Sequence, residues 1–170
     1  MDDVAQLTIR LARPADLLEL DALFARSYPF LLKHDYPPSV LVTALPLISK
    51  ANPRLLGSGT YYVALREGCI IGAGGWSWAG PQGGPSPLNM AHVRHLVTDA
   101  AHVRQGVARC LMGYAMAKAV QGGARVLCCQ STRTAVPFYR ALGFDVLGEV
   151  NITLKPGITF PAVDMRCFIG

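Results

Sequence analysis

The sequence has no apolar stretch long enough to cross a bilayer, because glycine, proline or a charged residue interrupts each one. It also has no internal repeat, no low-complexity tract and no long run of like charge. Near Met1, where a signal peptide would carry basic residues, the chain has Asp2 and Asp3. We therefore expect a soluble cytoplasmic protein without a membrane partner.

Charged and aromatic residues are scarce, at 16% and 8% of the 170 residues, whereas apolar residues make up 51%. Such a composition is typical of a globular protein. The length is within the usual range of one domain and is sufficient for a substantial core. No shift in composition marks a second domain, so we expect residues 1–170 to form one domain.

Cysteines are few and odd in number. The five are Cys69, Cys110, Cys128, Cys129 and Cys167, and their spacing shows no metal-binding pairs. We expect reduced thiols and no metal site. Neither Cys128 nor Cys129 has a histidine nearby in sequence, so both are interpreted as small apolar strand residues rather than covalent nucleophiles.

The net charge of +5 and the pI near 9.1 favour an anionic partner. Nucleic acid is one such partner. However, the sixteen Lys and Arg residues are scattered, and only Arg94, Arg104 and Arg109 form a loose cluster. We therefore expect a partner other than nucleic acid.

Apolar periodicity predicts an ordered series of strands and helices. The expected strands cover 7–12, 61–65, 69–78, 92–98, 125–130, 144–150 and 163–168. The expected helices cover 14–28, 40–48, 105–120 and 134–142, with an irregular segment over 29–38. Arg66-Glu67-Gly68 is typical of a hairpin turn, and Gly122-Gly123 of a helix end. The order predicts an α/β fold with a mixed sheet.

One segment combines a strand, a turn and a helix in a way that favours anion binding. The strand ends at Thr98, and Val103-Arg-Gln-Gly-Val-Ala-Arg109 leads into the helix. The first amides of a helix lack intrahelical partners and carry partial positive charge, so they can bind a phosphate or pyrophosphate. Gly106 has no Cβ to hold an anion away, and the two arginines add charge. An ordinary glycine flanked by solvated arginines is the alternative.

Two longer motifs resemble those of a known family. Arg94-His-Leu-Val-Thr-Asp, followed by Arg104-Gln-Gly-Val-Ala-Arg-Cys-Leu111, resembles the acetyl-CoA-binding motif of the GNAT superfamily of N-acetyltransferases. Thr134-Ala-Val-Pro-Phe-Tyr-Arg-Ala-Leu-Gly-Phe144 resembles that superfamily's next motif. Ile71 to Trp76 and Met165-Arg166 are similar to the third and last strands of small bacterial members.

The resemblance implies a GNAT-like fold and a cofactor. It implies a mainly antiparallel mixed sheet flanked by helices, whose fourth and fifth strands splay apart, which needs a break in strand pairing such as a bulge. It implies acetyl-CoA, with pantetheine against the backbone of Leu96, Val97 and Thr98. The implied pyrophosphate contacts are Val103, Arg104, Gln105, Gly106, Val107, Ala108 and Arg109. In the next motif, Ala135 and Phe138 are further cofactor positions.

The chain departs from the family pattern at two cofactor positions. Val103 stands where Gln or Arg is usual, which removes a side-chain contact but leaves the amide. Thr132 stands where many members carry an Asn, and either Thr132 or Ser131 can donate a hydrogen bond in its place.

The resemblance also implies a reaction, the attack of an amine on a thioester. The family's proton donor to the leaving thiolate corresponds to Tyr139, whose alternative role is that of a packed helix tyrosine. A strand amide near Val97 can stabilise the oxyanion. The fifth strand has no carboxylate to act as base, so the base is His92, whose ordinary pKa of about 6.5 suits the task, or a chain of waters. His95 should face the opposite side of the strand, because its separation from His92 is odd.

The resemblance implies an acceptor that is a primary amine of a small molecule, peptide or protein. Tyr28, His34, Asp35 and Tyr36 lie where the family builds its acceptor site, and their mixture also fits a surface loop. Trp76 and Trp78 share one strand face and are either core or acceptor-pocket residues. Because dimers are common in the family, a homodimer is also compatible with the resemblance.

Two other functions remain open from the sequence. The absent carboxylate fits an acyl-CoA-binding regulatory module that has lost turnover, although Tyr139 argues against it. The basic pI alone fits a toxin-type acetyltransferase that acts on aminoacyl-tRNA.

Overall fold

The computed structural model describes residues 6–84 and 86–170, and one seven-stranded sheet runs through this part of the chain. Its strands are β1 (Thr8–Leu11), β2 (Tyr61–Arg66), β3 (Cys69–Ser77), β4 (Met90–Thr98), β5 (Val126–Ser131), β6 (Asp145–Lys155) and β7 (Ile158–Phe168). Their order across the sheet is β1-β2-β3-β4-β5-β7-β6. Neighbours pair antiparallel except β4 and β5, which are parallel. The predicted mixed, mainly antiparallel sheet is confirmed.

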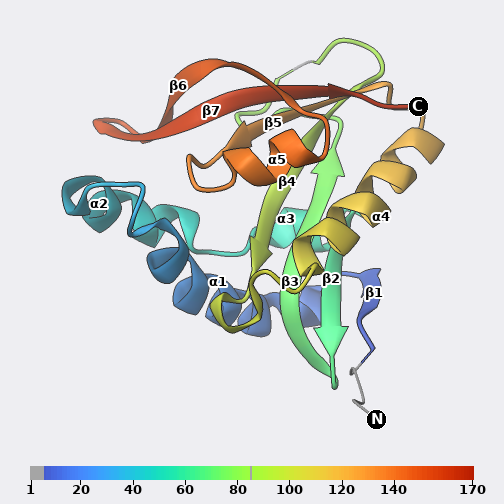
Figure 1. Cartoon of the computed structure of the whole chain (residues 1–170), viewed down its shortest axis with the longest axis horizontal. Coiled ribbons are helices and arrows are strands. Elements are labelled where there is room, and N and C mark those ends of the chain that lie inside the picture. Colours follow the sequence, from blue (N-terminus) through green and yellow to red (C-terminus); the bar gives the residue numbers. More distant parts are fainter. Residues whose placement is uncertain (1–5, 85) are drawn as a thin grey trace.

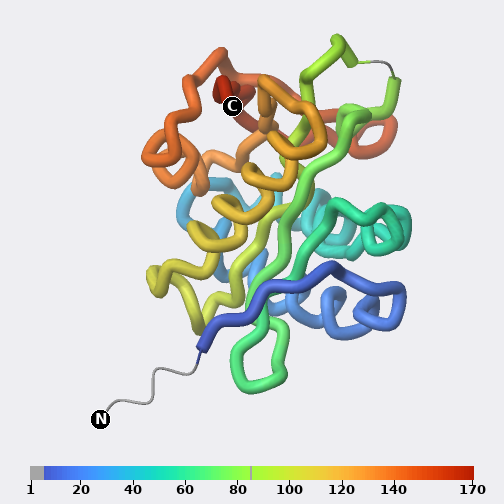
Figure 2. The backbone as a smooth tube through the Cα atoms, turned by 90° about the vertical axis from the view of Figure 1, so that its right-hand side faces the viewer, coloured from blue at the N-terminus to red at the C-terminus, as the bar shows by residue number. Residues whose placement is uncertain are grey.

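Helices cover both faces of this sheet. They are α1 (Leu17–Leu32), α2 (Pro38–Ile48), α3 (Pro53–Leu56), α4 (Val107–Gln121) and α5 (Val136–Ala141), with short 3-10 turns η1 (Pro14–Asp16) and η2 (Ala100–His102). Figure 1 shows α1 and α2 on one side of the strands and α4 on the other, and Figure 2 shows the same layers turned by 90°. Leu111 and Met112 of α4 belong to one buried core, and Leu20 and Phe24 of α1 belong to the other.

Local sequence signals fix several element ends. Glu67 and Gly68 join β2 to β3 with φ values of +52° and +77°, as a tight hairpin turn of the favoured hand requires. Gly106 precedes α4 with φ +80°, and Gly123 follows the helix with φ +102°. Few residues other than glycine adopt such values cheaply, so these positions limit the helix.

Three expectations about element extent are wrong. Helix α1 runs four residues past Tyr28, through Pro29 to Leu32, and continues there because Leu32 is buried against the core. The short helix α3 was not predicted; Asn52 caps it by accepting a hydrogen bond from the Arg54 amide. Strands β6 and β7 extend to a turn around Gly157 (φ +81°), well beyond the predicted ranges.

The two central strands separate after a short contact. Within the described residues, β4 pairs with β5 only from Met90 to His92, opposite Val126 to Cys128. On its other side β4 carries a bulge: Arg94 pairs with Gly75 and Val97 pairs with Ala73, so two residues, His95 and Leu96, oppose one glycine. His95 has φ +49°, which is the left-handed backbone of one kind of bulge. The expected splay is therefore present, with a bulge beside it.

The bulge changes which way His95 faces, and the prediction that it faces away from His92 is wrong. In a regular strand Val93 and Val97 would share a face, but Val93 lies in the core under α4 and Val97 in the core under α1. His92 lies between two residues of the α4-side core, so it faces away from α4. His95 packs its ring 4.4 Å from that of Phe24 in α1. Both histidines therefore lie on the face away from α4.

Candidate functional site

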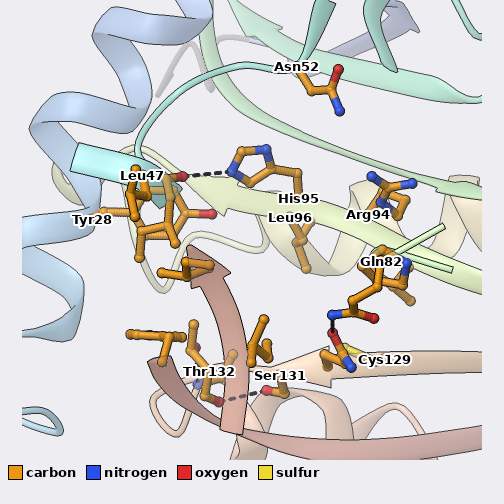
Figure 3. Close-up of a pocket in the computed structure, with 18 of the residues that line it drawn as sticks. Tyr28, Leu47, Asn52, Gln82, Arg94, His95, Leu96, Cys129, Ser131 and Thr132 are labelled. Carbon is orange, nitrogen blue, oxygen red and sulfur yellow. Dashed lines mark hydrogen bonds between the residues drawn. The ribbon is translucent and has the colours of Figure 1, made fainter. Parts of the chain in front are cut away.

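A cavity of about 600 Å³ lies between β4 and β5 where the two strands part. Residues Val93 to Leu96 of β4 line it on one side, and Cys129 to Thr132, at the end of β5 and just past it, line it on the other. The end of α2 and the β6–β7 hairpin complete its wall with apolar side chains, namely Leu47, Ile48, Ile152, Leu154 and Phe160. Figure 3 shows Arg94 and Gln82 at one end of the cavity and Tyr28 and Leu47 at the other.

The structure places the predicted site residues in four locations. Tyr139, Leu96, Thr132 and Ala135 line the large cavity. Val97, Thr98 and Phe138 lie beside it without lining it, and the Val103–Arg109 loop lies beyond the end of β4. His92 lines a smaller, adjoining cavity of about 230 Å³.

Tyr139 is buried, at 4% exposure, with its ring packed edge-on against Phe144 at 5.2 Å. Burial, together with the nearby Cys129, raises its pKa well above the usual tyrosine value. The hydroxyl is therefore protonated at neutral pH and can act as a hydrogen-bond or proton donor. Burial also raises the pKa of Cys129 to about 12, so that thiol is not a nucleophile.

His95 is a cavity residue whose protonation is fixed by its contacts. Its Nε2 lies 3.0 Å from the carbonyl oxygen of Ile48. Burial first, and then the charge of Arg94, hold the pKa of His95 at about 4, even though the hydrogen bond to the Ile48 carbonyl favours the protonated ring. The ring is thus neutral near pH 7. Its position in the cavity could not be predicted, because strand alternation gives the wrong face and only the bulge corrects it.

The loop that leads into α4 has the geometry of an anion site. Gly106 is the N-cap of the helix, and a Cβ added there would meet no atom within 4 Å. Arg104, with φ +60°, and Arg109 are exposed at its rim. Among the described residues, neither arginine forms an ion pair.

A buried carboxylate anchors this loop to α1. Asp99 caps η2 by accepting a hydrogen bond from the Ala101 amide, at 2.9 Å. It also accepts two hydrogen bonds from Arg26 of α1, at 2.7 and 3.0 Å. Burial alone would raise the pKa of Asp99, but these hydrogen bonds and the Arg26 charge outweigh it and keep the pKa below its ordinary value.

His92 has a polar environment of its own. Its Nε2 lies 2.6 Å from the hydroxyl of Ser86, and its pKa is lowered by burial and by Arg94. Its cavity also contains Asp164 and adjoins the large one, because Gln82 and Gln130 line both. His92 therefore lines the cavity next to the one that Tyr139 lines.

Thr132 and its neighbours are partly committed to local structure. The Thr132 hydroxyl accepts a hydrogen bond from the Ala135 amide at 3.2 Å, near the start of α5. The Ser131 hydroxyl donates to the Thr132 carbonyl at 2.7 Å. Thr132 retains its own O–H as a donor toward the cavity, whereas Ser131 has used its donor.

Of the four residues expected near the acceptor, the structure brings only Tyr28 to the cavity. Tyr36 is buried; its hydroxyl donates to the Pro161 carbonyl and accepts from the Arg133 amide. Asp35 accepts a hydrogen bond from Thr134, and His34 is exposed. Trp76 is core, whereas Trp78 is 43% exposed.

The sequence also matches the model of a known protein family. A family model described as "Acetyltransferase (GNAT) domain" matches residues 57–146, just over half of the chain. The chain belongs to the GNAT acetyltransferase family. No curated protein sequence matches this GNAT chain.

Solved structures share the GNAT fold at low sequence identity. A GCN5-related N-acetyltransferase from Rhodopseudomonas palustris is 17% identical over 95% of both chains, with a TM-score of 0.77. The PaiA N-acetyltransferase of Thermoplasma acidophilum, solved with coenzyme A, is 14% identical over 96% of this chain and 99% of that one, with a TM-score of 0.71. The ribosomal-protein-S18-alanine N-acetyltransferase of Escherichia coli is 16% identical over 97% and 95%, with a TM-score of 0.64.

Acetyl-CoA is the cofactor of the GNAT family, whose members act on amine acceptors. The residues present here fit that cofactor: the open amides at the start of α4 suit its pyrophosphate, and the gap between β4 and β5 suits an extended chain. Within the part of the chain that the structure describes, no helix is long and apolar enough to span a membrane.

Proposed function

We propose that this protein is an N-acetyltransferase that moves an acetyl group from acetyl-CoA to a primary amine by direct attack. The observation that carries the proposal is the cavity between the splayed strands, which has the neutral, buried Tyr139 in its wall. The anion-binding loop before α4 supports it independently. We extend the proposal to one catalytic domain over residues 1–170, located in the cytoplasm.

The cofactor would be held at three places. The amides of Arg104 to Arg109 would bind the pyrophosphate, with one side-chain contact fewer because Val103 is apolar. The backbone of Leu96, Val97 and Thr98 would pair with pantetheine. Thr132, Ala135 and Phe138 would contact the cofactor from the other side of the gap, where β5 ends and α5 begins.

When bound, acetyl-CoA would supply a thioester carbonyl. The amine nitrogen would form a bond to the carbonyl carbon, and the carbon–sulfur bond would break. Tyr139 would donate its proton to the leaving sulfur and take one back from those that the amine releases. An amide of β4 near Val97 would donate to the oxyanion. The acceptor, which is mostly protonated in water, releases its protons through a base.

His92 is the proposed base and would act through water. It is neutral at pH 7, because its pKa is lowered, and its cavity shares Gln82, Gln130 and Cys129 with the cavity of Tyr139. The expected contribution of such a base is about 10²- to 10⁴-fold in rate. A water chain without His92 is the competing arrangement, and His92→Gln separates the two: it lowers kcat only if His92 is the base.

The test is a measurement of CoA binding and of thiol release on the same preparation. Calorimetry with CoA should show binding, and free thiol should appear when acetyl-CoA is mixed with a panel of primary amines. CoA binding without thiol release from any amine would make the protein a binding module instead. Failure to bind CoA would overturn both functions.

A further inference from the structure

The charged side chains of the large cavity have one sign. Lys50 and Arg94 line it, and among the described residues of its wall there is no Asp or Glu. Asp164 lines only the smaller cavity beside His92. A cationic amine entering this space would therefore meet like charge without a counter-ion.

Arg94 is held in the cavity wall with most of its donors free. Its Nη1 donates to the Ser77 hydroxyl at 3.0 Å, which is its only side-chain hydrogen bond among the described residues. The guanidinium is about half buried, and burial lowers its pKa. Keeping such a group out of water without a carboxylate costs free energy. That cost is recovered when a ligand brings an anion, because the guanidinium fork matches a carboxylate.

Coenzyme A itself cannot be the anion at Arg94 if it binds as proposed. Arg94 lies four residues before the end of β4, about 13 Å along the strand. The phosphate-binding loop lies beyond that end and does not line the cavity. Arg94 therefore remains available to the acceptor.

Two more donors and one acceptor line the same cavity as Arg94. Asn52 uses its side-chain oxygen to cap α3, which leaves its amide hydrogens for the cavity that it lines. Lys50 is exposed at the cavity edge. Gln82 donates to Gln130 at 2.9 Å, so the Gln82 side-chain oxygen can still accept from an amine.

We propose that the acceptor is a small amine that also carries an anionic group, and that Arg94 binds this group. The proposal rests on the acetyltransferase function above and names its substrate class. The anion is a carboxylate or a phosphonate-like group, since both match the guanidinium. The same charges disfavour cationic polyamines.

A matched series of amines tests the proposal. The probes are ω-amino acids from glycine to 6-aminohexanoate, ω-aminoalkylphosphonates, and the alkylamines and diaminoalkanes of equal chain length, each assayed by thiol release from acetyl-CoA. We expect kcat/KM for the anionic amines to exceed that for the matched diamines at least tenfold. The best chain length reports the distance from the reacting nitrogen to Arg94, and the carboxylate and phosphonate arms show which anion fits.

Variants locate the effect at Arg94. Arg94→Gln should lower kcat/KM for anionic amines by about 10- to 100-fold, as expected for a lost charge-assisted pair, and for alkylamines much less. Arg54→Gln removes the same charge from an exposed arginine of α3 outside the cavity. It should change kcat/KM neither for the anionic amines nor for the alkylamines. A preference for diamines, or an equal loss for all amines in Arg94→Gln, overturns the proposal.

Calorimetry keeps the substrate class separate from the activity. The same probes are titrated into the protein–CoA complex. Anionic amines that bind weaker than diamines, or that do not bind, overturn the substrate class while CoA binding and thiol release stand. Loss of CoA binding instead overturns the acetyltransferase function.

Discussion

His95 and Ile48 are joined by a hydrogen bond of 3.0 Å between the imidazole Nε2 and a carbonyl oxygen. A carbonyl only accepts, so Nε2 carries the proton and Nδ1 has the free lone pair. The contact ties the bulge in β4 to the end of α2, and both residues line the cavity. It also makes the fold sensitive to acid.

Because His95 is buried in its neutral form, the free energy of unfolding should fall as the pH falls. Its pKa in the folded chain is about 4, compared with 6.5 ordinarily. Above pH 6.5 the residue is neutral in both states, so its contribution is fully present. Between pH 6.5 and 4 the unfolded chain takes up a proton that the folded chain refuses, and the free energy of unfolding falls by about 3 kcal/mol.

His95→Asn measures this effect, because asparagine tolerates the positive φ of the bulge. Urea unfolding at pH 7 and pH 4.5 should show a smaller pH-dependent loss in the variant than in the parent. His34→Asn, at an exposed position, is the control and should behave like the parent. Equal losses in His95→Asn and the parent would show that His95 titrates normally.

Tyr139→Phe should separate chemistry from binding. Removing the hydroxyl removes the proton donor, and we expect kcat to fall by about 10²-fold or more. The ring packing against Phe144 is kept, so CoA affinity and the melting temperature should stay within error. Steady-state kinetics and calorimetry on the same preparation measure both. Tyr114→Phe, on the exposed face of α4, controls for loss of a hydroxyl, and a kcat that stays at the parent level in Tyr139→Phe would remove Tyr139 from the mechanism.

Two glycines of the α4 region give opposite expectations. Gly106→Ala forces a Cβ into φ +80°, at a cost of about 1–2 kcal/mol, and places a methyl group in the proposed phosphate site. Gly113→Ala lies in the helix interior with open space around the new Cβ, and should stabilise by about 0.5–1 kcal/mol. Thermal melts and CoA titration test both. Only Gly106→Ala should weaken CoA; unchanged affinity there would move the phosphate site elsewhere.

Arg26→Gln should loosen the same loop from the side of α1. Asp99 would lose two hydrogen bonds, and we expect about 1–3 kcal/mol less stability and a severalfold rise in the Kd for CoA. Arg10→Gln breaks the comparable pair with Asp16, whose two hydrogen bonds are 2.8 and 2.9 Å. Arg10 lies in β1, three strands away from β4 and its loop. It should cost similar stability without changing the Kd. If both variants bind CoA alike, the Asp99 anchor does not position the loop.

The sequence predicts those features that depend on neighbouring residues. Glu67-Gly68 predicts its hairpin, and Gly122-Gly123 the end of α4, because a single backbone conformation decides each. The alternation of apolar and polar residues from Asn151 to Phe160 is typical of strands, and it indicates the extended β6–β7 hairpin. The sequence predicts an irregular segment from residue 29, but α1 continues through Pro29, since the burial of Leu32 outweighs one lost hydrogen bond.

The cavity is less accessible to sequence reasoning, for a physical reason. It joins side chains from Tyr28 to Phe160, and no local pattern reports such distant contacts. The side chains that β4 turns toward the cavity depend on the bulge at His95, where a histidine adopts a backbone conformation that favours glycine or asparagine. Tyr139 and Thr132 were found because a motif marks them. For Arg94 the sequence predicts only a place in a loose basic cluster and at the start of the cofactor motif, with no role toward the acceptor.

The narrow contact between β4 and β5 has a consequence for engineering acyl-chain length. With three residue pairs joining them in the described chain, the two half-sheets are held together mainly by the core beneath α4, which includes Ile71 from one half and Met165 from the other. Leu111 and Met112 fill that core without lining the cavity. Changing their volume should widen or narrow the gap, so selection for bulkier acyl donors is expected to enrich substitutions there.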